Sequence, residues 1–359
     1  MVQLNKFLLL NLITFINLIK SYNWWPIDSI YNIKPHQIYK FNLLEHPLII
    51  VNNKVGLHCY EDRCLHRGMS LSSGKLENSN IICNYHGWSY SIADGVNNNE
   101  VNHKCNLNKY PLKVHNNFIY VGLNLNTEIK LQKTSYNTHI ENKLLEYELY
   151  NVETSNNENY YFSNEPVLNT PIMKKDINLP WSYIMTNNLD NSHLHYVHSN
   201  SIGRIKFNPT NVVFNDIKKD VTYYGGEKEV YFQFIPPYGI YSYFKINSVK
   251  VFEQYAKIVP LTKYSSRVLY QQKFQNLPTI SLTFSNIITG IIQEDISILE
   301  EQYNNHLKFL KKYGKEDDEE KNPNKINPID WNNIDVMDSL PYYWHKIWYN
   351  ENKDKLPWF

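Results

Sequence analysis

The sequence has few cysteines, few glycines and almost no net charge, and each shortage argues against a class of protein. Four cysteines in 359 residues are too few for a disulfide-stapled scaffold. A formal net charge of +1 provides no overall field to attract nucleic acid, so we expect no nucleic-acid partner. The 12 glycines form no Gly-x-Gly-x-x-Gly motif, which argues against a bound flavin or nicotinamide dinucleotide.

Long hydrophobic runs are also lacking. The apolar run FLLLNLITFINLI at residues 7–19 has 13 residues, too few to span about 30 Å of hydrocarbon. Its length suits a leader peptide, and it equally suits an amphipathic helix that packs on the protein or rests on a membrane surface. Residues 1–22 are therefore an apolar leader or an N-terminal helix. We expect a cytoplasmic protein, or one associated with an organelle or membrane if this run is a leader or anchor.

The next part of the chain predicts a small β-domain. Residues 23–125 contain short strand-like runs separated by turn residues, and the runs at 47–51 and 55–60 read as a hairpin. Residues 126–158 are polar and weakly patterned, as expected of a linker or an insertion.

Residues 159–359 predict a second domain with longer elements. Apolar residues at three- and four-residue steps predict a helix over residues 292–310. Strands of one antiparallel sheet are predicted at residues 230–235, 241–251 and 266–274. The sequence as a whole therefore predicts an α+β protein.

Two short segments each pair a cysteine with a histidine, Cys64-Leu65-His66 and Cys83-Asn84-Tyr85-His86. Two thiolates and two imidazoles are the ligands of a [2Fe–2S] cluster in which histidines replace two cysteines on one iron. The same four groups also satisfy tetrahedral zinc, although zinc motifs more often group cysteine with cysteine and histidine with histidine. The alternation of ligand types favours the cluster over zinc.

A second set of candidate ligands lies in the middle of the chain, where Asp190-x-x-His193 is followed five residues later by His198. If this segment is helical and its second turn loosens slightly, the three residues lie near one face. Two imidazoles and one carboxylate form the facial triad of non-haem Fe(II) oxygenases, which leaves positions open for O₂ and substrate. A histidine pair alone is weak evidence, because motif matches of this kind often mislead.

Together the two sets resemble the alpha subunits of Rieske non-haem iron oxygenases, nearest the O-demethylase and pheophorbide a oxygenase branches. The resemblance covers residues 24–310, and Leu65 departs from it where the family usually has proline. It implies a Rieske β-domain at residues 23–125 and, at 159–359, a helix-grip-like antiparallel sheet with helices that hold a mononuclear iron. The motifs that carry it are Cys64-x-His66-Arg67, Cys83-x-x-His86-Gly87-Trp88 and Asn187-x-x-Asp190-x-x-His193-x4-His198.

The resemblance also implies the metal ligands. One [2Fe–2S] cluster per subunit would be held by Cys64, His66, Cys83 and His86. One Fe(II) per subunit would be held by His193, His198 and Asp295, because family members place an aspartate at that last position.

Two further carboxylates need a role. Glu294 competes with Asp295 for the iron, and its alternative role is that of a charge in the first turn of a helix. Asp190 is implied to be a catalytic residue that binds no metal. It would accept hydrogen bonds from a ligand histidine of the iron site and from a cluster histidine across a subunit boundary.

The family pattern further implies chemistry and partners. Electrons would come from a separate reductase or ferredoxin, and O₂ would be used to hydroxylate or oxidatively demethylate a small apolar or aromatic substrate in a homotrimer. We expect the sheet between residues 205 and 290, rich in Tyr, Phe and Ile, to line the substrate pocket. Two alternatives stay open, a Rieske electron carrier without oxygenase activity and a sterol-type desaturase of the same superfamily.

Overall fold

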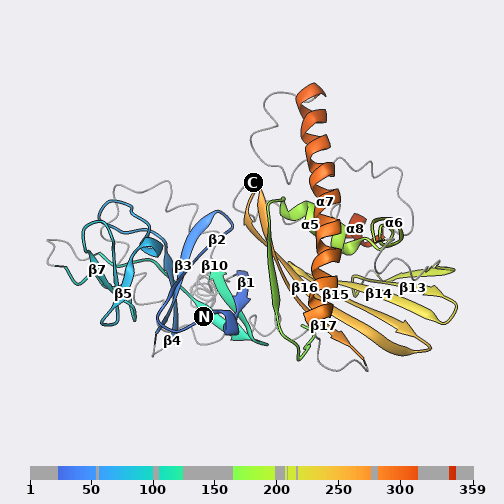
Figure 1. Ribbon diagram of the computed structural model, residues 1–359, viewed down its shortest axis with the longest axis horizontal. Coiled ribbons are helices and arrows are strands. Elements are labelled where there is room, and N and C mark those ends of the chain that lie inside the picture. Colours follow the sequence, from blue (N-terminus) through green and yellow to red (C-terminus); the bar gives the residue numbers. More distant parts are fainter. Residues whose placement is uncertain are drawn as a thin grey trace, which may run out of the picture.

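The computed structural model describes residues 23–53, 56–99, 105–123, 165–198, 207, 209–215, 217–275, 282–313 and 339–344. The predicted leader at 1–22 and the predicted linker at 126–158 lie outside these residues. In the part described, antiparallel strands predominate and helices are few (Figure 1), which confirms the predicted α+β class. Small sheets form the N-terminal part, and one large sheet with helices forms the C-terminal part (Figure 1).

In the described N-terminal part, the strands form small antiparallel sheets. The predicted hairpin is confirmed, because β3 (His46–Asn53) pairs with β4 (Gly56–Glu61) from Leu48 opposite Glu61 to Asn53 opposite Gly56. Short 3-10 helices cover Ile30–Asn32 and Leu71–Ser73. One sheet has the order β2 (Ile38–Leu43), β3 (His46–Asn53), β4 (Gly56–Glu61) and β8 (Lys109–Tyr110). The others are β5 (Lys75–Glu77), β6 (Asn80–Ile82) and β7 (Ser89–Ser91), and β1 (Asn23–Ser29), β10 (Phe118–Leu123) and β9 (Leu112–His115).

The large sheet is antiparallel throughout and has seven described strands, in the order β11-β17-β16-β15-β14-β13-β12. Their bounds are β11 (Met173–Ile177), β12 (Asn211–Asn215), β13 (Asp220–Gly225), β14 (Lys228–Ile235), β15 (Gly239–Ile246), β16 (Val249–Thr262) and β17 (Ser265–Phe274). The predicted strands at 230–235 and 266–274 are confirmed in β14 and β17.

The predicted strand at 241–251 is wrong as a continuous element. The chain reverses at Asn247 and Ser248, so this segment is the end of β15 and the start of β16. The φ angles of the two turn residues are 51° and 65°, the pair of positive values that a tight two-residue hairpin turn requires. Neither residue is glycine, and the usual Asn-Gly signal of such a turn is therefore missing from the sequence.

The described helices are α5 (Trp181–Leu189), α6 (Leu194–Val197), α7 (Leu282–Tyr313) and α8 (Ser339–Tyr342). The predicted helix at 292–310 is confirmed as part of α7, which begins ten residues earlier. α7 crosses the large sheet, and α5 contacts β16, β17, α7 and α8 (Figure 1). Within the described residues, no helix combines the length and the apolar character needed to cross a membrane.

Alternation along the strands places the core between the large sheet and the helices. In β14, Phe234 belongs to the same hydrophobic core as Ile296 and Leu299 of α7, and Val230 and Phe232 pack against that core. Residues that alternate with them point to the opposite face, because successive side chains of a strand project to opposite sides. The helix face with Ile296 and Leu299 therefore packs against one side of the sheet.

The same core continues into the N-terminal part. The indole of Trp25 in β1 meets that of Trp181 at the start of α5, with 6.3 Å between ring centroids. Polar contacts cross the same boundary, since the Arg267 guanidinium donates to the carbonyl oxygen of Ile27 at 2.8 Å. The sheet β1-β10-β9 is therefore packed against the large sheet through both apolar and polar contacts.

Candidate metal centres

Two matching loops carry the paired cysteines and histidines. The N–H of Gly68 donates to the carbonyl oxygen of Cys64 at 2.8 Å, and that of Gly87 donates to Cys83 at 3.0 Å. The N–H of each cysteine donates to the carbonyl oxygen of the residue after its glycine, at 2.7 and 2.8 Å. The two glycines have φ of 74° and 73°, values that a side chain would strain. The loops therefore repeat one backbone geometry.

The side chains of the two loops converge. Cys64 and Cys83 are buried, and the imidazole rings of His66 and His86 lie 4.6 Å apart between centroids. Burial raises the pKa of the Cys83 thiol, and the adjacent Cys64 sulfur raises it further, while the backbone N–H of Tyr85 lowers it. Among the described residues, Nδ1 of His66 is buried with no hydrogen-bond partner. A metal bound to that atom would satisfy it, and the donor set fits a [2Fe–2S] cluster as well as zinc.

Leu65 has a contact that proline could not make. Its N–H donates to the hydroxyl of Tyr90 at 3.1 Å, and the same hydroxyl lies 3.3 Å from the sulfur of Cys64. Proline has no N–H to donate. The departure from the family pattern therefore ties the first loop to Tyr90 while leaving all four donors in place.

The second centre joins the segment after α5 to the middle of α7. Ligand atoms of His193, His198 and Asp295 all lie within 4.8 Å of one another. Asp295 Oδ1 is 3.0 Å from Nε2 of His198 and 3.4 Å from Nε2 of His193. The two imidazole rings are 5.4 Å apart between centroids and inclined by 66°. Two Nε2 atoms and a carboxylate oxygen therefore face one small space.

The chemistry of this donor set fits a divalent cation. In the described part of the chain, Asp295 Oδ1 is buried and makes no hydrogen bond, although two ring nitrogens are near it. Burial disfavours the charged form of His193, but Asp190 and Asp295 outweigh it and raise the pKa of His193 to about 9. Burial also opposes the charged form of Asp295, yet the two imidazoles lower the pKa of that carboxyl. The site therefore favours positive charge, and a ferrous ion with two imidazoles and one carboxylate would supply it.

Each imidazole of this centre has a second carboxylate at its other nitrogen. Asp190 Oδ2 lies 3.3 Å from Nδ1 of His193, and Glu294 Oε2 lies 2.7 Å from Nδ1 of His198. Asp190 is itself held by Ser192, whose N–H and hydroxyl both donate to its Oδ1 at 2.7 Å. Carboxylates in this position orient metal-binding imidazoles.

The structure differs from a single helix through residues 190, 193 and 198. α5 ends at Leu189, and Asp190 has extended backbone with φ −86° and ψ 130°. The N–H of Asp190 closes α5 by donating to the carbonyl oxygens of Thr186 and Asn187. His193 then precedes the short α6, so a break between two helices brings Asp190 beside His193.

The sequence left open whether Glu294 or Asp295 faces the metal site. The structure directs Asp295 toward both Nε2 atoms and places Glu294 behind His198. The role of Glu294 as a first-turn helix charge is wrong, because α7 begins at Leu282 and Glu294 lies well inside it.

The link between Tyr183 of α5 and Nδ1 of His306 in α7 had no sequence signal, since 123 residues separate the pair.

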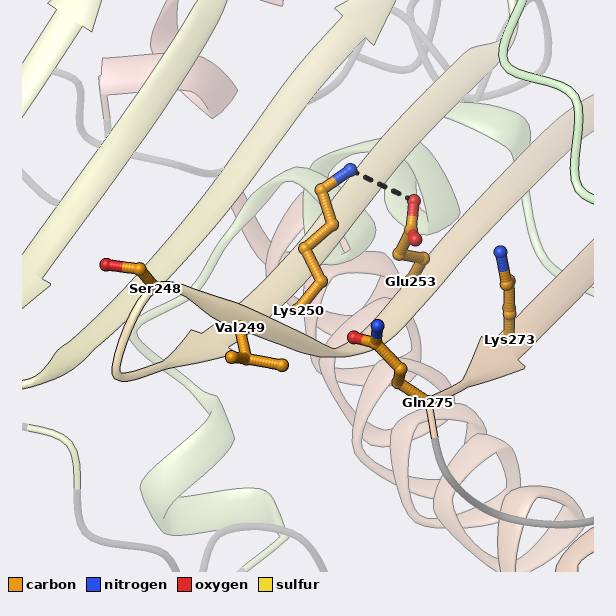
Figure 2. Close-up of a pocket in the computed structure, with 6 residues that line it drawn as sticks. All are labelled: Ser248, Val249, Lys250, Glu253, Lys273 and Gln275. Carbon is orange, nitrogen blue, oxygen red and sulfur yellow. Dashed lines mark hydrogen bonds and ion pairs between the residues drawn. The ribbon is translucent and has the colours of Figure 1, made fainter.

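A cavity of about 350 Å³ lies away from these centres, at the β15–β16 turn and the end of β17 (Figure 2). It is lined by Ser248, Val249, Lys250, Glu253, Lys273 and Gln275. The Lys250 ammonium lies 3.1 Å from Glu253 Oε2, the contact drawn in Figure 2. This polar lining is unlike the apolar substrate pocket predicted on the same sheet, and that pocket stays a prediction.

Comparisons with known proteins match the part of the chain that holds the first centre. A model of the Rieske [2Fe–2S] domain matches residues 23–111, which include all four paired cysteines and histidines. The 4beta-methylsterol monooxygenase of Methylococcus capsulatus is 34% identical over 68 residues, 19% of this chain and 18% of that protein. The ferredoxin component of the alkene monooxygenase system of Xanthobacter autotrophicus is 34% identical over 83 residues, 23% of this chain and 66% of that protein. The chain thus matches about a fifth of the length of the first of these relatives.

Solved structures extend the likeness to the whole fold. NdmA of Pseudomonas putida CBB5 with caffeine has a TM-score of 0.62 and 16% identity, covering 92% of this chain and 90% of that one. Dicamba monooxygenase bound to dicamba has a TM-score of 0.61 and 13% identity, covering 93% and 96%. The chain therefore carries a Rieske [2Fe–2S] domain at residues 23–111, and its fold is similar to those of NdmA and dicamba monooxygenase.

Proposed function

We propose that this protein is a Rieske-type mono- or dioxygenase that hydroxylates or oxidatively demethylates a small apolar or aromatic substrate. The observation that carries the proposal is the meeting of His193, His198 and Asp295 in the same chain as a Rieske domain. A Rieske domain alone transfers electrons, whereas two imidazoles and a carboxylate add a site at which a metal keeps open positions.

Under this proposal, the chain's own residues hold and orient the metals. When bound, the [2Fe–2S] cluster would supply single electrons and the ferrous ion would supply open positions for O₂ and substrate. Asp190 keeps Nδ1 of His193 engaged, so that Nε2 of the same ring faces Asp295. The cluster ligands are proposed to be Cys64, His66, Cys83 and His86, and the ligands of the ferrous ion are proposed to be His193, His198 and Asp295.

The apolar or aromatic substrate is supported by the side chains on the helix-covered face of the large sheet. Phe234 belongs to the core on that face, and the partly buried Val230, Phe232 and Phe274 pack against it. The names of similar proteins point to the same kind of substrate, since one acts on a methylsterol and another was solved with caffeine. Pockets for such ligands are mostly apolar with few polar groups.

The electron donor is proposed to be a separate reductase or ferredoxin. The chain has no dinucleotide-binding motif of its own, and one carbazole dioxygenase with this fold was solved in complex with its ferredoxin.

We also propose a homotrimer in which Asp190 of one subunit faces a cluster histidine of the next. Light scattering coupled to size-exclusion chromatography tests this assembly, and a monomer at micromolar concentration would refute it.

The alternative from another class is an electron carrier without oxygenase activity. It is favoured by the similarity to a ferredoxin component, of which the match covers 66%. A carrier of that kind has no use for a second centre built by the α5–α6 segment and α7. Iron and inorganic sulfide analysis separates the two: we expect about three irons per chain for the oxygenase and about two for the carrier. Two irons would overturn the proposal, and zinc in place of iron with no Rieske electron paramagnetic resonance signal would make the first centre a zinc site.

Turnover tests the reaction itself. The purified protein, coupled to a reductase and ferredoxin pair, would be offered methoxyaromatic compounds, sterols and chlorophyll derivatives under O₂. Release of formaldehyde marks demethylation, a gain of 16 mass units marks monohydroxylation, a gain of 34 marks dihydroxylation, and a loss of two marks the desaturase alternative. Consumption of O₂ and reductant without a modified product from any class would count against the proposed activity.

A further inference from the structure

Glu294 and Asp295 are neighbours on α7, and their carboxylates contact opposite nitrogens of the same imidazole. Asp295 Oδ1 is 3.0 Å from Nε2 of His198, and Glu294 Oε2 is 2.7 Å from Nδ1. Consecutive residues of a helix project about 100° apart. One turn of α7 therefore places a carboxylate on each side of His198. Asp295 faces the candidate metal site, and Glu294 contacts the ring nitrogen of His198 that points away from it.

The carboxylate of Glu294 holds Nδ1 of the buried His198 imidazole by a hydrogen bond. The His198 side chain is 1% exposed, whereas that of Glu294 is 34% exposed and sits at the margin of the site. A buried imidazole whose Nδ1–H donates to a carboxylate has its proton fixed on Nδ1, and the lone pair stays on Nε2. The contact thus selects the tautomer in which Nε2 can bind a metal.

The two imidazoles of the site are oriented from different elements. His193 is oriented by Asp190, which belongs to the break after α5, at 3.3 Å. His198 is oriented from α7, at the shorter distance of 2.7 Å. Because Asp295 also belongs to α7, a single helix carries both the proposed third ligand and the group that aims the second one. A shift of α7 would therefore move the two together.

We propose that Glu294 is a positioning residue that fixes the tautomer and ring orientation of His198 for binding the mononuclear metal. The proposal rests on the metal site of the proposed function and assigns Glu294 no place among the ligands. Loss of such a carboxylate typically lowers metal affinity about 10- to 100-fold. Glutamine keeps an oxygen that can accept the Nδ1–H but lacks the charge, so its effect should lie between those of glutamate and alanine.

The test compares Glu294→Ala and Glu294→Gln with the wild-type protein and with Glu300→Ala. Glu300 is exposed on the same helix, so its removal matches the loss of charge without touching the site. Equilibrium competition with a ferrous chelator gives the Fe(II) affinity, and the electron paramagnetic resonance spectrum of the nitric oxide adduct reports the geometry of the mononuclear site. The Rieske spectrum and the thermal midpoint report the cluster and the fold.

We expect Fe(II) affinity to fall about 10- to 100-fold in Glu294→Ala and less in Glu294→Gln. Glu300→Ala should match the wild type, and the Rieske spectrum should be unchanged in all three variants. Equal affinity in Glu294→Ala and the wild type would overturn the inference while leaving the proposed function intact. Complete loss of the third iron in Glu294→Ala, with retention in Asp295→Asn, would make Glu294 the ligand. A wild-type protein with only two irons would refute the proposed function as well.

Discussion

Replacing Lys257 by methionine should cost the protein a large part of its stability. The Lys257 ammonium is fully buried and lies 2.6 Å from Glu165 Oε1, whose side chain is 1% exposed. It also hydrogen-bonds the hydroxyl of Tyr120, which in turn donates to Glu165 Oε2 at 2.8 Å. Tyr120 belongs to β10 and Lys257 to β16, so the cluster joins the N-terminal part to the large sheet.

The magnitude follows from what the substitution leaves behind. Methionine fills a similar volume, but the Glu165 carboxylate stays buried without its cation. Removing one partner of a buried pair costs about 3–5 kcal/mol. Lost attraction to the surrounding rings adds to this, since the ammonium lies 4.4 Å from the centroid of Phe118 and 4.7 Å from that of Tyr255.

The informative comparison is a double-mutant cycle with Glu165→Gln. Lys257→Met/Glu165→Gln removes both charges, and glutamine can still accept the hydroxyl proton of Tyr120. Replacing a whole buried pair by neutral groups of similar volume is often neutral or stabilising. We therefore expect the double variant to regain most of the stability that Lys257→Met loses.

Urea unfolding at pH 7, followed by tryptophan fluorescence and circular dichroism, measures the four proteins. Coincident transitions by the two probes would justify a two-state comparison. A loss below about 1 kcal/mol in Lys257→Met would refute the reasoning. So would a double variant as unstable as the sum of the single ones, because the two charges would then be uncoupled.

Four further outcomes are expected. Asp295→Ala should lower the iron content from about three to about two per chain and leave the Rieske signal intact, and loss of that signal would mean that the two sites are misassigned. Cys83→Ser should show the opposite pattern, with the signal lost and ferrous ion still bound at the second centre by chelator competition. Asp190→Asn should retain both metals yet slow the decay of the reduced cluster in single-turnover experiments with O₂, and a wild-type rate would contradict its role. Burial lowers the pKa of Lys257 from 10.5 to about 8. Between pH 8 and 10.5 the folded chain therefore binds fewer protons than the unfolded chain, so the contribution of Lys257 to the free energy of unfolding should rise with pH across this range. Unfolding midpoints of the wild type and of Lys257→Met/Glu165→Gln at pH 7.5 and 9.5 measure that slope, and parallel changes in the two proteins would contradict it.

The sequence by itself determined the features that depend on neighbouring residues. One residue lies between Cys64 and His66, and two lie between Cys83 and His86, so each pair lies in one loop whatever the rest of the chain does. The amphipathic period of residues 292–310 likewise predicted a helix that α7 contains. Local signals failed where they were incomplete: the turn at Asn247 and Ser248 lacks a glycine, so the sequence predicts one strand where the structure has the β15–β16 hairpin.

Only the tertiary structure decided the partners that are far apart in the chain. Glu294 and His198 are separated by 96 residues, and Lys257 and Glu165 by 92. Such contacts depend on sheet register, on where a helix crosses the sheet and on which side chains are buried together, and none of these is encoded in a local pattern. The packing of α7 over the sheet therefore settled how Asp295 and Glu294 face the two nitrogens of His198, which the sequence alone had left as a competition between two adjacent carboxylates.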